Sequence, residues 1–245
     1  MPRKSRSACA ILLGLLGVGP PEDGTNIAVQ GGGGRYQYQH IGCEGIDANL
    51  YGVNAAHGYA AVTSRSGNFT IAAEGTIEPG KVRRAECTGC SSRPDFAHTV
   101  TRGAANLRLG GHWAYGGFEL GGGMGSYPNS RGPGAFDSVL FPSLSLWAGT
   151  PDVVYFWSSF NAGPRQPGPF AGVGRQDARF DLTAGIGSLL TPANDLRPGV
   201  ALAFDAKPHP MFWPGVDLRY QDHDNWSLGL RLTIHFDARA ADADR

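Results

Sequence analysis

The clearest pattern in the chain is a strict alternation of apolar and polar residues near its C-terminal end. Residues 227–236 read SLGLRLTIHF, and every second position is apolar: Leu228, Leu230, Leu232, Ile234 and Phe236. A period of two residues is that of a β-strand with two different faces. The same period recurs through residues 34–236, where no segment has the 3.6-residue period of an amphipathic helix. The sequence therefore predicts an all-β protein.

The candidate strands are longer than those of soluble proteins. They are 34–43, 57–65, 69–77, 104–113, 116–125, 138–148, 153–160, 178–187, 198–205, 212–221 and 226–236. Most have nine to eleven residues, the length with which a strand crosses a bilayer at a tilt of about 45°. Soluble strands average about five or six residues.

The connections between these strands alternate in length. Short links at 66–68, 114–115 and 149–152 alternate with long ones at 78–103, 126–137 and 161–177. This alternation gathers the long loops at one end, as in an up-and-down transmembrane β-barrel. We expect about ten strands, with eight or twelve as alternatives. Continued to the end, however, the alternation sends the last strand to the long-loop end, whereas outer-membrane barrels finish at the periplasm. A superfluous strand near 207–210 or a wrong N-terminal assignment would explain this.

The best-defined hairpin is 104–125. A two-residue turn at Ala114 and Tyr115 pairs three positions across the strands: Trp113 with Gly116, Gly111 with Phe118, and Leu109 with Leu120. In this register Phe118 covers Gly111, as aromatic side chains cover strand glycines elsewhere. On the other face Arg108 lies diagonally across from Glu119.

One face of the predicted strands is apolar and the other carries the charges. In a bilayer the charged face points into the lumen, whereas in a soluble barrel it points outward. The predicted lumen charge network is Glu74, Arg108, Glu119, Arg179, Asp181, Asp205, Asp217, Arg219 and Arg231. Because unpaired buried charges are costly, a near-balanced inward set predicts paired side chains in a plugged or very narrow lumen. The alternative is that several of these residues lie at the rim in water.

Aromatic residues gather near the predicted strand ends, which is typical of interfacial girdles. They are Tyr36, Tyr38, Trp113, Tyr115, Tyr127, Trp147, Trp157, Trp213 and Trp226. The alternative is ordinary core or turn packing.

Composition and the N-terminal residues indicate an exported chain. The 37 glycines suit closely packed strands, and only 17% of residues are charged. Residues 1–6 form a basic region, and residues 8–19 form an apolar run too short to span a membrane as a helix. We therefore predict a signal peptide at 1–19, with a cleavage site as late as about residue 30. The barrel domain is expected at 34–236, followed by a polar tail at 237–245. Without the signal peptide 18 basic residues face 21 acidic ones, so we expect no nucleic-acid partner.

Three cysteines remain after export, and they favour a disulfide over a metal site. Cys87 and Cys90 form a C-x-x-C, and Cys43 is the third thiol. In an oxidising compartment a disulfide among the three is expected, whereas a zinc site would need a second ligand pair. We predict no metal site and no cofactor.

No catalytic motif stands out in the sequence. The run QDHDNWS at 221–227 is the one His-rich polar turn next to strands, and it holds His223 and Ser227. These two residues faintly resemble the His and Ser of outer-membrane lipid A deacylases, although the close H-x-S-N spacing is missing. A solvated turn, or a loose divalent-cation contact through Asp222 and Asp224, is the simpler interpretation. We expect no enzymatic activity.

The terminal strand resembles the C-terminal assembly signal of bacterial outer-membrane β-barrel proteins. In that family an alternating apolar strand ends on an aromatic residue, as this one ends on Phe236. The departure is the tail that follows it. The resemblance implies an outer-membrane location, contact with outer-membrane lipid, and recognition by the barrel-assembly machinery. The expected role is structural, surface-interacting or narrow-pore. The alternatives are a secreted soluble all-β binding module and a barrel-embedded lipid-modifying hydrolase.

Overall fold

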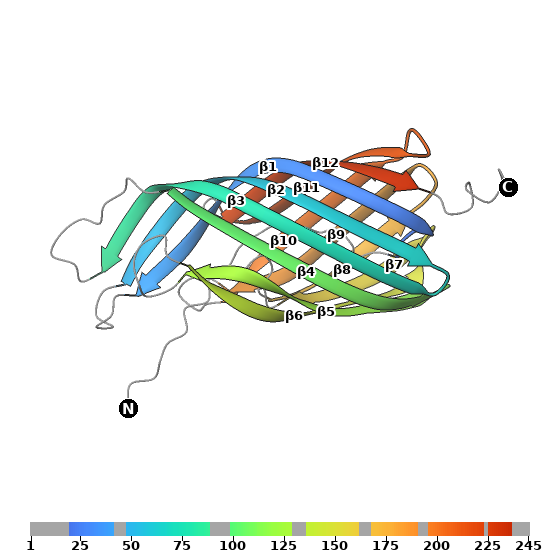
Figure 1. The fold of residues 1–245 in the computed structure, drawn as a ribbon, viewed down its shortest axis with the longest axis horizontal. Helices are drawn as coiled ribbons and strands as arrows, with labels where there is room; N and C mark the ends of the chain where they lie inside the picture. The colour runs from blue at the N-terminus through green and yellow to red at the C-terminus, as the bar shows by residue number, and fades with distance from the viewer. Residues whose placement is uncertain are drawn as a thin grey trace, which may run out of the picture.

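The structure, a computed structural model, describes residues 20–41, 48–88, 99–128, 136–161, 168–190, 196–222 and 225–236. These residues form a closed antiparallel barrel of twelve strands (Figure 1). The strands are β1 Gly24–Ile41, β2 Ala48–Ser66, β3 Phe69–Thr88, β4 Thr99–Trp113, β5 Gly116–Pro128, β6 Phe136–Thr150, β7 Val154–Asn161, β8 Gly168–Gln176, β9 Phe180–Leu190, β10 Leu196–Ala206, β11 Phe212–Asp222 and β12 Asn225–Phe236.

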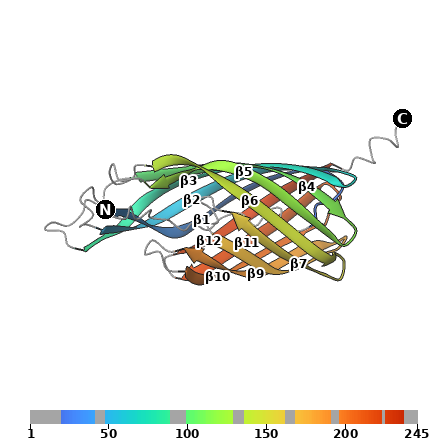
Figure 2. The ribbon, with the colours of Figure 1, turned by 90° about the horizontal axis from the view of Figure 1, so that it is seen from below.

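Each strand pairs with its neighbours in sequence, and the first strand pairs with the last. Thr25 of β1 lies opposite Phe236 of β12, and the pairing continues to Arg35 opposite Trp226. The strands run obliquely to the long axis of the barrel (Figure 2). β1, β2 and β3 have 18, 19 and 20 residues, whereas β7 and β8 have eight and nine. The predicted up-and-down barrel is therefore confirmed, with twelve strands.

One strand, β8, lies inside the segment expected to be a long loop. Residues 168–176 read GPFAGVGRQ, and only Phe170 and Val173 are large and apolar. A strand so rich in glycine carries little of the alternation by which the others are recognised. Its position is fixed instead by pairing on both sides, with β7 and β9.

The barrel also begins earlier than expected, at Gly24 rather than at residue 34. Residues 26–30 read NIAVQ, where Ala28 breaks the alternation of polarity, and the run of glycines at 31–34 removes it. These glycines are held in the strand by two partners, since Gly31 lies opposite both Leu230 of β12 and Gly58 of β2.

An even number of antiparallel strands places the start of the first strand and the end of the last strand at the same end of the barrel. Short connections follow β2, β4, β6, β8 and β10, and they lie at the same end as the start of β1 and the end of β12. Residues 207–211 are one of these connections and hold no extra strand. The eleven candidate strands lacked β8, and this missing strand is why the alternation sent the last strand to the wrong end. We call this end of the barrel the short-turn mouth.

The hairpin of β4 and β5 has the predicted register. Trp113 pairs with Gly116, Gly111 with Phe118, and Leu109 with Leu120. A Cβ built on Gly111 would lie 3.2 Å from the Phe118 ring, so the ring covers the glycine closely. The neighbouring turn of β2 and β3 uses Gly67 with a φ of 57°, a left-handed conformation that glycine adopts at low cost.

Candidate functional site in the barrel lumen

The two faces of the barrel wall differ in polarity. On β12 Arg231 and His235 are buried inside the barrel, whereas Leu230 on the outer face is 69% exposed. The outer face of other strands is equally apolar, with exposed Ile27, Val62, Leu109, Leu120, Leu140, Ile186, Leu202 and Leu218. An apolar belt around a polar interior is the architecture of an outer-membrane β-barrel. A soluble barrel would place the apolar face inside, so the soluble-module alternative does not fit.

The predicted aromatic girdle is only partly correct. Trp113 and Tyr115 are exposed at the short-turn mouth, at 52% and 69%, and Phe69, Phe212 and Phe236 are exposed at the same end. This set is typical of side chains at a membrane interface.

Four of the predicted girdle residues instead point into the barrel. They are Tyr36, Trp147, Trp157 and Trp213, all buried. The period of two places them on the inner face, where Trp147 and Trp157 pack with Tyr155 and Phe170. Trp226 is partly buried, and the side chains of Tyr38 and Tyr127 lie outside the described residues. The aromatic cluster narrows the lumen on the side of β6, β7 and β8.

A hydrogen-bonded cluster crosses the adjoining wall of β2 to β5, centred on Arg108 of β4. Its Nη1 donates to Glu74 Oε1 of β3 at 2.7 Å, and its Nε donates to Glu119 Oε2 of β5 at 2.9 Å. Tyr59 of β2 and Asn106 of β4 also donate to Glu74, at 2.8 and 2.9 Å. Two carboxylates thus share one guanidinium. The strands that carry these side chains are tied together through the lumen as well as through their backbones.

The cluster extends to β6 through a histidine. Trp147 Nε1 donates to His112 Nδ1 at 2.9 Å. Because Nδ1 accepts this hydrogen bond, the neutral ring carries its proton on Nε2, which lies 3.6 Å from Glu119 Oε1. Hydrogen bonds therefore link Tyr59 of β2 to Glu119 of β5 through Glu74 and Arg108, and His112 with Trp147 lies beside the Glu119 end of this series.

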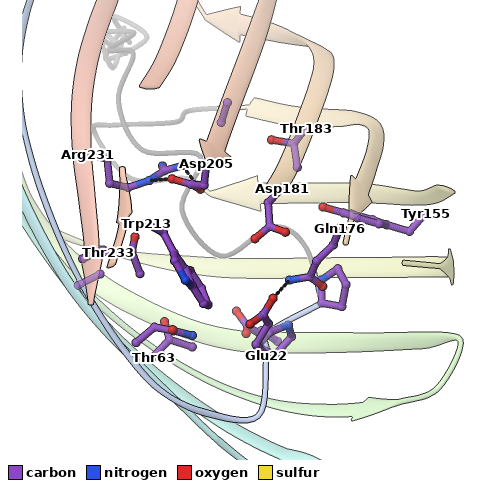
Figure 3. Close-up of a pocket in the computed structure, with 17 residues that line it drawn as sticks. Glu22, Thr63, Tyr155, Gln176, Asp181, Thr183, Asp205, Trp213, Arg231 and Thr233 are labelled. Carbon is purple, nitrogen blue, oxygen red and sulfur yellow. Dashed lines mark hydrogen bonds and ion pairs between the residues drawn. The ribbon is translucent and has the colours of Figure 1, made fainter. Parts of the chain in front are cut away.

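A second ion pair joins two strands that are not neighbours. Arg231 of β12 donates from Nε to Asp205 Oδ1 of β10 at 2.9 Å and from Nη2 to Asp205 Oδ2 (Figure 3). The strand between them, β11, places Gly215 opposite both residues. Since glycine has no side chain, the ion pair can lie directly over β11.

The short-turn mouth holds a third group of charges. Residues 20–23 precede β1 and lie in this mouth, and we call them the strap. Glu22 of the strap pairs with Lys207, whose Nζ also lies 2.6 Å from Asp181 Oδ1 of β9. Gln176 Nε2 of β8 donates to Glu22 Oε1 at 3.4 Å (Figure 3). Burial acts to lower the pKa of Lys207, but the carboxylates of Asp181 and Glu22 outweigh it and raise the pKa above its usual value.

A cavity lies just inside the strap. Its volume is about 140 Å³, and its wall includes Tyr155, Asp181, Thr183, Asp205, Trp213 and Arg231 (Figure 3). The polar groups around it are carboxylates, hydroxyls, the amides of Asn26 and Gln176, and one guanidinium. This composition suits water or a small polar solute more than an apolar ligand.

A further buried pair lies toward the long-loop end and was not anticipated. Arg102 Nη2 of β4 donates to Glu78 Oε2 of β3 at 2.8 Å, and the Arg102 guanidinium lies 3.2 Å from the centroid of the Tyr36 ring. Both charged residues fall in the segment 78–103, which was expected to be a loop. They continue the inward alternation of Thr76 and Ala104, so extending each strand by two residues would have found them.

The remaining residues of the predicted lumen charge network have different surroundings. Asp217 and Arg219 of β11 are fully buried on the inner face. Arg179 is exposed in the turn between β8 and β9, where Asp177 Oδ1 accepts a hydrogen bond from its backbone N–H at 2.7 Å. β9 begins at Phe180, one residue after Arg179. Arg179 therefore belongs to the turn and not to the inner face of the strand. Gln30 Nε2 and His57 Nε2, which were not predicted, lie 3.2 Å apart inside the wall.

The other candidate residues give little support to a chemical site. Ser227 is buried on the inner face, away from the lipid-facing belt, and His223 lies outside the described residues. Cys43 and Cys90 also lie outside them, and Cys87 is on β3 with its side chain not described. Within the described ranges no three His, Cys, Asp or Glu side chains are grouped as metal ligands. The same ranges contain no helix long and apolar enough to cross a membrane.

Comparison with known proteins finds similarity in structure alone. No family model and no curated protein matches the sequence. One similar solved structure is a bacterial polysaccharide outer membrane secretin, 12% identical, with 89% of this chain and 100% of that chain covered and a TM-score of 0.38. Another is a mutant of Rh. blastica porin, 8% identical, with 86% and 100% covered and a TM-score of 0.36. The fold assignment rests on the strand pairing of this chain itself.

Proposed function

We propose that the chain is a bacterial outer-membrane β-barrel with a non-enzymatic, narrow-pore role. It would admit water and small ions and exclude the larger solutes that a general porin passes. The observation that carries this proposal is the way in which side chains occupy the lumen. Arg108 bridges Glu74 and Glu119 on one wall, Arg231 bridges to Asp205 on another, and Trp157 and Phe170 fill the space on a third.

The pairing of these charges supports a filled lumen over an open one. The guanidinium of Arg108 lies 2.7–2.9 Å from its two carboxylate acceptors. In a poorly hydrated interior, separating such a pair would leave both charges uncompensated, so the pair stays together. The cavity beside them measures about 140 Å³, which holds a few waters and is too small for an oligosaccharide.

Planar-bilayer recording tests the pore size. The purified barrel should give no large steady conductance, and liposomes that contain it should not swell in isosmotic sugar solutions. An open-porin control inserted in the same bilayer shows that insertion and detection work. A large, steady conductance of this chain at neutral pH would overturn the narrow-pore role.

The outer-membrane location has a test of its own. The apolar belt supports contact with outer-membrane lipid, so the chain should stay in the membrane fraction after salt and carbonate washes. A closed barrel should also migrate faster on gels without boiling than after it. Release into the soluble fraction without detergent would contradict the location.

We also propose that the barrel-assembly machinery recognises β12. Support comes from Leu228, Leu230 and Phe236, which share the outer face of that strand. A Phe236→Ala chain should give less assembled barrel, whereas a chain that ends at Phe236 should assemble as the full chain does. Equal assembly of the Phe236→Ala chain would contradict this recognition.

A further inference from the structure

The strap at the short-turn mouth is held by charged side chains from two separate parts of the barrel rim. Glu22 pairs with Lys207, which follows β10, and Asp23 Oδ1 lies 3.1 Å from Arg65 Nε of β2. The Pro21 carbonyl accepts a further hydrogen bond from Arg65 Nη1. The strap therefore reaches from Arg65 at the end of β2 to Lys207 after β10 and to Gln176 of β8. Figure 3 shows Glu22 beside Gln176.

The strap separates two spaces. The cavity of about 140 Å³ inside the barrel is lined by Pro20, Pro21 and Glu22. A hollow of about 400 Å³ at the mouth is lined by the same three residues, together with Trp113 and other rim residues. Since the same short segment borders both, moving it would join the inner cavity to the mouth.

The contacts of the strap can be released without leaving a buried charge alone. Lys207 keeps Asp181 at 2.6 Å when Glu22 departs. Arg65 keeps the carbonyl of Gly67, to which its Nε donates at 3.0 Å. Lys207 thus keeps a carboxylate partner in the barrel, and Arg65 keeps a backbone acceptor on a side chain that is 20% exposed. The largest cost of breaking a buried ion pair, an uncompensated buried charge, is therefore avoided.

The backbone of the strap can also leave the mouth at little cost. Pro20 and Pro21 have no N–H, so this part of the chain crosses the mouth without donors that the barrel would have to satisfy. Glu22 and Asp23 become hydrated carboxylates when they leave. The attachment is thus mainly electrostatic: Glu22 and Asp23 provide the ion pairs, and the Pro21 carbonyl adds one hydrogen bond.

We propose that the strap is a charge-latched gate of the short-turn mouth, closed while Glu22 holds Lys207 and open to small ions when this pair breaks. The inference rests on the narrow-pore role proposed above and adds the element that controls it. The strap is the moving part, and the paired charges of the wall stay in place.

Exchanging the two charges tests the gate. Single-channel recordings would compare the wild-type barrel with Glu22→Lys, with Lys207→Glu and with the double exchange E22K/K207E. Each single exchange places like charges together and should raise the open-to-closed ratio about fivefold or more, the effect of losing about 1 kcal/mol. The double exchange restores an opposite pair and should return the ratio toward the wild-type value.

A matched control uses Asp152, an exposed carboxylate in the turn between β6 and β7 at the same mouth. Asp152→Lys changes the charge of the rim by the same amount as Glu22→Lys, and it should leave the open-to-closed ratio unchanged. If Asp152→Lys raised the open-to-closed ratio as much as Glu22→Lys does, the effect would come from the net charge of the rim and the proposal would be overturned. The proposal would also be overturned if the wild type, both single exchanges and the double exchange had the same open-to-closed ratio, a result that leaves the narrow-pore role intact. A wild-type barrel that conducts strongly at all times would instead contradict the narrow-pore role itself.

The gate also requires that the exported chain keeps the strap. The intact mass of the chain recovered from membranes should correspond to a start at or before Pro20. A mature chain that starts at Gly24 or later would lack Glu22, and the gate would be excluded whatever the recordings give.

Discussion

Arg231 and Asp205 form a two-point ion pair across an intervening strand, directly over Gly215. The pair can form only because β11 has no side chain at this position. A Cβ built on Gly215 would lie 1.9 Å from Asp205 Oδ1 and 2.8 Å from the Phe204 carbonyl oxygen. The glycine is therefore a structural requirement of the ion pair as well as a residue of the strand.

The first prediction concerns Gly215→Ala. The added methyl group should displace the Asp205 carboxylate and lower the free energy of unfolding by about 1–3 kcal/mol. Urea unfolding of the barrel in lipid vesicles measures this. Gly31→Ala is the matched control, because nothing lies within 4 Å of a Cβ built there, and its effect should stay within about 0.5 kcal/mol. Equal effects of the two substitutions would mean that the ion pair does not constrain Gly215.

The second prediction tests which solvent surrounds the apolar belt. Leu230→Arg places a cation on the outer face near the middle of β12. In a bilayer this change should lower the free energy of unfolding by about 2–4 kcal/mol. On the surface of a soluble protein the same change would be nearly neutral. Val153→Arg, at an exposed position in the turn between β6 and β7, should be nearly neutral in either environment. Unfolding in vesicles compares the two, and a neutral Leu230→Arg would contradict lipid contact at this position.

The third prediction concerns the Arg108 cluster. Arg108→Met leaves Glu74 and Glu119 without their shared cation, which should cost about 3–5 kcal/mol of unfolding free energy. Replacing both acids as well, in R108M/E74Q/E119Q, removes the uncompensated charge and should recover a large part of that loss. Should the single variant fail to assemble, assembly of the triple variant supports the same conclusion. A triple variant no more stable than Arg108→Met would indicate that packing, and not charge, holds this wall.

The fourth prediction is a pH dependence of the mouth. Lys207 faces Glu22 of the strap, Asp181 of β9 and the Asp177 carbonyl, and its ammonium lies 4.9 Å from the centroid of the Trp213 ring. Because the folded pKa is raised, its ion pairs contribute in full below the ordinary lysine pKa of about 10.4 and are lost as the pH rises through the folded pKa.

This sign means that the wild-type barrel should lose stability, and the strap its attachment, only at strongly alkaline pH. Unfolding midpoints measured between neutral and alkaline pH should fall more steeply for the wild type than for Lys207→Met. Lys81→Met, which removes an exposed lysine of β3, should keep the wild-type profile. Parallel profiles of wild type and Lys207→Met would exclude a contribution from these ion pairs.

Several elements could be predicted from the sequence because their own residues determine them. β12 alternates without exception, so its faces follow from the period of two alone. The register of β4 and β5 follows from a two-residue turn, which fixes every pairing after it. Arg108 and Glu119 then meet because a diagonal pair on one face is within reach of long side chains.

Other elements depend on partners that a local pattern does not reveal. β8 and the glycines of β1 are strands because they have hydrogen-bonding neighbours on both sides. Asp205 and Arg231 come from strands that are not adjacent, so their contact follows only when the registers of β10 with β11 and of β11 with β12 are both known. The contact of the strap with Lys207 depends on barrel closure as well, since Glu22 approaches Lys207 only when β1 is paired with β12.

The pairing of Thr25 with Phe236 has a consequence for how the barrel is made. The first strand of the described chain finds its second neighbour only when the last one has been synthesised, so ring closure is the strand pairing with the largest sequence separation among the described residues. Such long-range pairings are expected to form slowly. Until then both margins of the sheet present unpaired backbone groups, which invite pairing with other chains. A chain shortened by its last strand would therefore be prone to aggregate rather than form a smaller pore.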